Sequence, residues 1–177
     1  MSGNDAWAEL VKARIARVEE HVRLENEHDL EGVMQTYSES ARYDDEPYDE
    51  HHSGSGEVRR YYERLMRAVP DMRIDVQRRH ATDEVVILEC VIGGTHLGEW
   101  RGLPATGRRL RFPLCAVYTF EGDRLAGERI YYDRATVLRQ VGVFHEPDTR
   151  MGRVLTALTH PMTMIRAIAR MARRGTT

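Results

Sequence analysis

The chain has 177 residues, of which 41% are hydrophobic and 31% are charged, and its formal net charge is −2. This length and composition predict one domain with a hydrophobic core, because 177 residues are few for two full domains. The near-neutral charge gives no reason to expect nucleic acid as a partner, and no apolar run approaches the roughly 18 residues of a membrane-spanning helix.

Helical periodicity dominates the first 70 residues. One apolar stripe at three- and four-residue steps predicts a first helix of about five turns. Its members are Trp7, Leu10, Val11, Ile15, Val18 and Val22. Asp29 suits the N-cap of a short second helix, and a third helix is expected from near Gly56 to Pro70. The first residues include acids and lack the apolar stretch of a secretory leader, so we expect a cytoplasmic protein.

Strand-like patterns follow. Residues 72–81 alternate weakly, and residues 85–92 are almost continuously apolar, which predicts a central strand covered on both faces. Residues 110–120 form a long alternating strand with Tyr118 on its apolar face, and a Gly-containing turn leads into a return strand at 125–133. Helices followed by closely connected strands predict an α+β fold: an antiparallel sheet with helices on one face and a ligand cavity between them.

Four segments carry a resemblance to a known family. They are GSGEVRRYYERLMRAVPDMRIDV at 54–76, GTHLGEWRGLPATGRRLRF at 94–112, EGDRLAGERIYYD at 121–133 and TVLRQVG at 136–142. Together they resemble SnoaL-like polyketide cyclases of the nuclear transport factor 2-like superfamily over roughly residues 12–144.

The resemblance implies a cone-shaped fold, with a curved antiparallel sheet wrapped round a pocket and capped by the N-terminal helices. It implies a homodimer through the outer sheet face and a role in secondary metabolism. It also implies an intramolecular aldol closure of polyketide-like esters without metal or organic cofactor. By motif position a pocket aspartate, Asp133, is the general acid/base, and His96 in the GTH motif is a second catalytic candidate.

The chemistry of Asp133 can be stated from first principles. Aldol closure needs a base for a proton next to a carbonyl and an acid for the new alkoxide, and one buried carboxyl group with a raised pKa can serve as both. Asp133 also immediately precedes an expected helix at 136–141, where an aspartate commonly caps the first turn. Both interpretations stay open from sequence.

Other candidates line the same expected pocket. Arg129 and Tyr131 share the face of Asp133 in a regular strand, although an arginine there would lower the aspartate's pKa. His96 either polarises a carbonyl or pins a strand end, and Trp100 either stacks on a flat substrate or belongs to the core. The remaining candidate substrate-binding residues are Tyr37, Tyr43 and Tyr118, with Asp44 beside the first two at the pocket mouth.

The acidic, histidine-containing loop at 44–52 lacks the ligand spacing of a metal site, so no metal or cofactor is expected. The chain is expected to divide into a SnoaL-like domain at 1–144 and a basic amphipathic helical extension at 145–177. That extension carries six arginines and two acids. It is expected to pack on its own domain or a dimer mate, or to make weak peripheral contact with a membrane or protein partner.

Three functions fit these observations. The first is a cyclase or isomerase acting by proton transfer on a hydrophobic, polyketide-like molecule. The second is an epoxide hydrolase on the same scaffold, which needs an Asp–Arg–Asp set to orient a water molecule. The third is a small-molecule-binding module without catalysis, because a fold does not determine a function.

Overall fold

A computed structural model describes residues 3–174 of the chain. The chain forms two compact units, the first ending at Val141 and the second beginning at Gly142.

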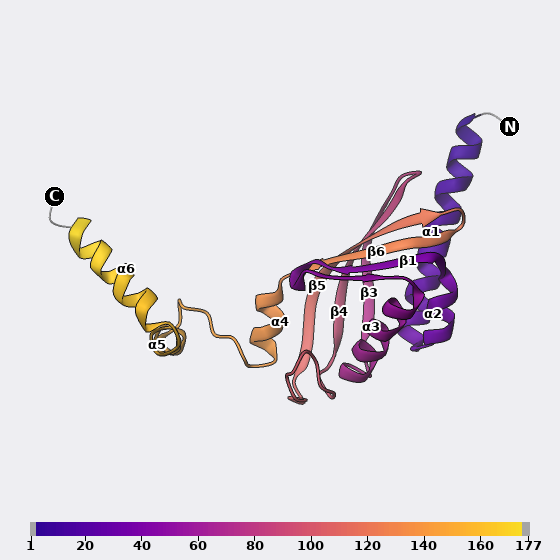
Figure 1. Cartoon of the computed structure of the whole chain (residues 1–177). Coiled ribbons are helices and arrows are strands. Elements are labelled where there is room, and N and C mark those ends of the chain that lie inside the picture. The colour runs from indigo at the N-terminus through magenta and orange to yellow at the C-terminus, as the bar shows by residue number, and fades with distance from the viewer. Residues whose placement is uncertain (1–2, 175–177) are drawn as a thin grey trace. The chain divides into compact units, whose positions relative to one another are not determined.

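Helices cover one face of the sheet in the first unit (Figure 1). They are α1 (Gly3–Glu27), α2 (Leu30–Thr36) and α3 (Ser55–Ala68). The short α4 (Arg134–Gln140) follows the last strand of the sheet. Asp29 caps α2 as predicted, since its side chain accepts a hydrogen bond from the backbone N–H of Gly32. Helix α3 ends at Ala68, two residues before Pro70, which cannot continue a helix.

Six strands form a single curved sheet in the order β2-β1-β6-β5-β4-β3 (Figure 1). Their bounds are β1 (Tyr37–Asp45), β2 (Glu50–Ser53), β3 (Arg73–Ala81), β4 (Val85–Thr95), β5 (Arg109–Glu121) and β6 (Arg124–Tyr132). Neighbouring strands are antiparallel except β1 and β6, which run parallel. The predicted α+β class is confirmed, with this one parallel pair as an addition.

Strand β4 differs from its prediction as a strand covered on both faces. Its residues alternate between buried and half-buried, with Val86, Leu88 and Cys90 on the buried side. The other side of β4, with Ile87 and Val91, lies on the half-exposed outer face of the sheet. The continuous apolar run at 85–92 therefore reflects a second face of the strand that is only partly covered.

The core lies between the helices and the inner face of the sheet. Its largest fully buried side chains include Tyr61, Tyr62 and Tyr118, so this interior is rich in phenol groups. Gly98, in the loop after β4, lies against the backbone of Arg67 at the end of α3, where a Cβ atom would overlap the carbonyl oxygen. This close approach holds the loop that carries Trp100 against α3.

The second unit contains α5 (Arg150–Thr159) and α6 (Pro161–Arg174). Thr149 caps α5, because its hydroxyl accepts a hydrogen bond from the Gly152 N–H at 2.9 Å. No helix in residues 3–174 is both long enough and apolar enough to cross a membrane.

Candidate active site

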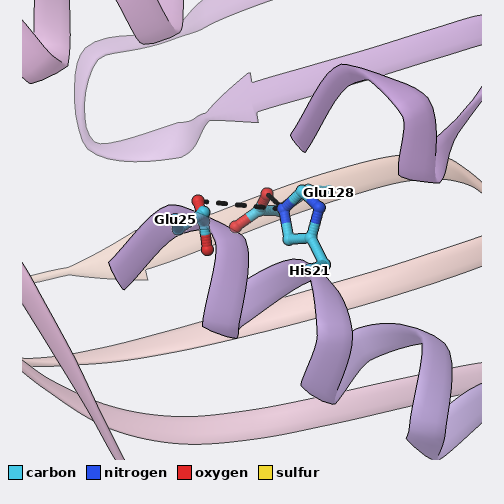
Figure 2. A group of neighbouring side chains, drawn as sticks. All are labelled: His21, Glu25 and Glu128. Atoms are coloured by element: carbon cyan, nitrogen blue, oxygen red, sulfur yellow. Dashed lines mark ion pairs between the residues drawn. The ribbon is translucent and has the colours of Figure 1, made fainter. Parts of the chain in front are cut away.

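Three ionisable side chains meet inside the first unit and form what we call the interior cluster: His21, Glu25 and Glu128 (Figure 2). His21 and Glu25 lie one turn apart on α1, and Glu128 reaches them from β6. The His21 Nε2 atom lies 3.4 Å from Glu128 Oε2 and 3.7 Å from Glu25 Oε1. All three side chains are at least 95% removed from solvent, so their charges interact with little screening by water.

Tyrosine hydroxyls surround Glu128. Tyr62 and Tyr37 donate to its Oε2 atom at 2.8 and 3.0 Å, and Tyr118 donates to Oε1 at 3.2 Å. A carboxylate that accepts three hydroxyl donors is stabilised in its ionised form. Glu128 is therefore the main hydrogen-bond acceptor of the interior cluster.

The hydrogen-bond pattern places a proton on both ring nitrogens of His21. Thr36 uses its one hydroxyl proton on the Val33 carbonyl at 2.7 Å, so His21 Nδ1 must donate to Thr36 Oγ1 at 2.6 Å. Tyr62 uses its proton on Glu128, so His21 Nε2 also faces acceptors only. A ring that donates from both nitrogens is an imidazolium, and in this pattern it offers no lone pair to a metal ion.

The charges agree with this assignment. Burial alone would lower the pKa of His21, but the neighbouring Glu25 and Glu128 raise it overall. Burial raises the pKa of Glu25 to about 7, with His21 opposing the shift and Glu128 adding to it. Oε2 of Glu25 has no hydrogen-bond partner among the described residues. Glu25 is thus a carboxyl group that exchanges its proton near neutral pH.

A second polar group, the mouth group, consists of Asp45, Glu50 and Arg101. Arg101 donates to Asp45 Oδ2 at 2.7 Å and to Glu50 Oε1. Tyr61 also donates to Asp45 Oδ2, at 3.1 Å. Burial raises the pKa of Asp45 against the opposing charge of Arg101. Its Oδ1 atom is buried without a partner among the described residues.

An open cleft of about 550 Å³ lies beside the mouth group. Its lining residues are Asp49, Glu50, His51, His52, Arg64, Glu99, Trp100 and Arg101. From this cleft a series of aromatic rings leads inward: Tyr61 lies 5.9 Å from Trp100 and 6.2 Å from Tyr62, centroid to centroid. Tyr62 in turn touches Glu128. Tyr61 therefore lies between the cleft and the interior cluster.

The structure corrects the expected position of Asp133. Its side chain is exposed and caps α4, accepting from the Ala135 N–H at 2.9 Å and from the Thr136 hydroxyl at 2.5 Å. The Thr136 hydrogen bond is the main cause of a lowered pKa, the opposite of what a base at neutral pH requires. Of the two interpretations left open by the sequence, Asp133 therefore has the role of a helix cap, and its side chain does not face the interior.

Arg129 and Tyr131 share this outward face. The predicted alternation of β6 is confirmed, but the buried side is that of Glu128 and Ile130. Arg129 is half exposed and pairs with Asp44 at 3.3 Å, and Tyr131 is 44% exposed. These two residues, like Asp133, therefore lie apart from the interior cluster.

His96 anchors a loop. Its Nδ1 atom accepts the Thr106 N–H at 3.3 Å, and its backbone pairs with Arg108 and Gly107. Burial lowers its pKa, so the ring is neutral at physiological pH. These contacts agree with the interpretation of His96 as a residue that pins a strand end. Here it holds the loop that carries Trp100.

The tyrosine candidates lie inside. Tyr37 and Tyr118 bind Glu128, and Tyr43 is buried with its ring 4.3 Å from that of Tyr61. His21 and Glu25, which were not predicted from the sequence, continue the apolar stripe of α1 one and two turns beyond Val18. A histidine and a glutamate at core positions of an amphipathic helix are the signal that could have revealed them.

Residues 13–141 match the model of the SnoaL-like polyketide cyclase family. A search of curated proteins found no significant match. Among solved structures, the chain is similar to AclR, a proposed hydroxylase from Streptomyces galilaeus, with 24% identity and a TM-score of 0.68 over 77% of this chain and 89% of AclR.

Two further structures are similar. IdmH, a proposed polyketide cyclase from Streptomyces antibioticus, has 22% identity and a TM-score of 0.63 over 73% of this chain and 99% of IdmH. A protein of ketosteroid isomerase-like fold from Catenulispora acidiphila has 16% identity and a TM-score of 0.61 over 72% of this chain and 92% of its own. At these identities the structures show a shared fold. The family match covers most of the chain, and the chain belongs to the SnoaL-like polyketide cyclase family.

Proposed function

We propose that this protein is a cyclase or isomerase that transfers protons at an enolisable carbon, with Glu25 as general acid/base. Membership in the SnoaL-like polyketide cyclase family supports a cyclase- or isomerase-type activity. The observation that carries the residue assignment is a buried carboxyl group with a pKa of about 7 and an unpartnered oxygen, held beside a buried histidine.

The proposed steps use only groups of the chain. Glu25 removes the proton next to a substrate carbonyl, and the enolate carbon attacks a second carbonyl within the same molecule. Glu25 then returns its proton to the new alkoxide, so that no proton is gained or lost overall. The His21 imidazolium stabilises the developing negative charge at short range, and Glu128 keeps the ring protonated.

The substrate class follows from the surroundings. A site bordered by tyrosine rings and one charged histidine suits a largely hydrophobic molecule with several carbonyl or hydroxyl oxygens. Substrate enters from the cleft by displacing the Tyr61 ring, since Tyr61 touches both Trp100 and Tyr62.

The test is product formation from a synthetic poly-β-keto ester that can close one ring. The wild-type protein should form the cyclised product faster than buffer, and Glu25→Gln should lose this acceleration while keeping the native circular dichroism spectrum. Exposed Glu27 on the same helix gives the matched control Glu27→Gln, which should react at the wild-type rate. Equal rates for both variants would end the assignment of Glu25.

A second candidate, epoxide hydrolysis, is favoured by the mouth group. Arg101 lies between two carboxylates, Asp45 and Glu50, as a water-orienting set requires. Asp45 would take a proton from water as the water oxygen attacks the epoxide carbon and the carbon–oxygen bond of the epoxide breaks. Protonated Asp45 would then return that proton to the opened alkoxide, which gives the diol. Turnover of epoxides in ¹⁸O-water, with label in the diol and loss in Asp45→Asn but not in Glu25→Gln, would favour this function.

The proposal includes a homodimer through the outer sheet face. Ile87 and Val117 pair across β4 and β5, and with Val91 they form half-exposed apolar surface there. Light scattering after size exclusion should give twice the chain mass for the wild type and a smaller mass for Val117→Asp. A monomeric wild type would contradict this part.

A further inference from the structure

The second unit carries an unusual charge distribution. Between residues 150 and 174 there are six arginines and no aspartate, glutamate or lysine. With Glu146 and Asp148 included, the extension from residue 145 has a net charge of +4, whereas the whole chain is at −2. The extension therefore has a net positive charge, whereas residues 1–144 sum to −6.

The same two helices expose large apolar side chains. Each of the following is between 55% and 75% exposed: Met151, Val154, Leu158, Met162, Ile165, Ile168 and Met171. Isolated exposed apolar residues are ordinary on protein surfaces, but seven of them within 21 residues are an unusual density of exposed apolar side chains. Exposed apolar side chains at this density indicate an interaction site for a membrane or a protein.

Helix geometry separates the apolar and basic residues of α6. At about 100° per residue, Ile165 and Ile168 lie within roughly 60° of each other. Arg166 and Arg170 lie within roughly 40° of each other, on the opposite side of the helix. Helix α5 repeats the apolar half of this pattern, since Met151, Val154 and Leu158 fall at steps of three and four residues.

We infer that α5 and α6 form a surface-binding element that lies flat on an anionic lipid bilayer. The apolar side enters the boundary between headgroups and acyl chains, and the arginines bind the anionic headgroups. No described helix can span a bilayer, which fits a helix that lies on the membrane. A second copy of the same helices would cover the apolar side but leave the arginines without an anionic partner, because residues 150–174 contain no acid.

This inference is independent of the proposed catalytic function, because it involves residues of the second unit only. It also gives the basic extension a physical role that the family match, which ends at residue 141, does not cover.

The experiment is co-sedimentation of the full-length protein with vesicles. Vesicles of phosphatidylcholine alone are compared with vesicles containing phosphatidylglycerol at low salt. We expect binding only when the anionic lipid is present and weaker binding at high salt, where charges are screened within a few ångströms.

Three double variants sharpen the test. Arg166→Gln with Arg170→Gln should weaken partitioning about 25-fold, since each basic residue at an anionic surface contributes about fivefold. Ile165→Ser with Ile168→Ser should weaken it more than tenfold, and these exposed positions leave the first unit unaffected. The matched control removes two exposed arginines of the first unit, Arg108 and Arg111, and should bind as the wild type does.

Each other outcome overturns the inference. Failure of the full-length protein to bind anionic vesicles at low salt excludes the bilayer as the partner. Normal binding by the isoleucine variant would show that charge attraction alone accounts for binding, without insertion of apolar side chains into the bilayer. Conversion of an oligomer to a monomer by that variant, with no change in vesicle binding, would assign the apolar surface to contacts between copies of the chain.

Discussion

Replacing Glu25 with glutamine should change how the stability of the protein depends on pH. Burial raises the pKa of Glu25 from an ordinary 4.5 to about 7 in the folded protein. A carboxyl group with a raised folded-state pKa stabilises the fold fully below its unfolded pKa, and this contribution is lost as the pH rises through the folded pKa. The stabilising contribution of Glu25 is therefore lost between about pH 4.5 and pH 7.

The size of the effect follows from the shift. At about 1.4 kcal/mol per pKa unit, ionising Glu25 in the folded state costs about 3 kcal/mol once the pH is well above 7. Glutamine has nearly the same shape and cannot ionise. The stability of Glu25→Gln relative to the wild type should therefore increase by roughly 2–3 kcal/mol between pH 5 and pH 9.

Urea denaturation at a series of pH values measures this difference directly. Glu27→Gln is the control, because Glu27 lies on the same helix and is exposed. Parallel pH profiles for the wild type and Glu25→Gln would refute the claim that Glu25 is a strongly perturbed carboxyl group.

Other substitutions test single contacts. Asp133→Ala should cost about 1 kcal/mol through loss of the α4 cap, seen as a lower urea midpoint, with no change in turnover. Tyr62→Phe should cost about 1–2 kcal/mol, because the interior cluster loses a buried hydroxyl donor; an unchanged midpoint would contradict that contact. Gly98→Ala should cost about 3 kcal/mol or more, because its Cβ would overlap the Arg67 carbonyl oxygen. Gly56→Ala, where a Cβ has room, should instead stabilise α3 by about 0.5–1 kcal/mol in the same assay.

The fold was largely predictable from the sequence. Periodicity located the helices, and the alternation of residues 110–120 identified β5 with its buried face, including Tyr118. The parallel pairing of β1 with β6 was not predictable, because strand periodicity is the same for both directions of pairing.

The site was harder to predict. Alternation in β6 separates Glu128 from Arg129 but does not say which faces inward, so Asp133 was assigned to the wrong side. The interior cluster joins residues more than 100 positions apart in sequence, on α1 and β6, and only the packed fold brings them together. Polar residues within an apolar stripe, such as His21, are the pattern that would have pointed there.

The most direct test of the central claim is proton exchange at a substrate carbon. An enolisable β-diketone is incubated in D₂O with the protein, and deuterium incorporation is followed by NMR. We predict that the wild type accelerates exchange, that Glu25→Gln loses about 10²–10⁴-fold of this rate, and that Asp133→Asn exchanges as the wild type does. Full exchange by Glu25→Gln, with loss in Asp133→Asn, would contradict the account.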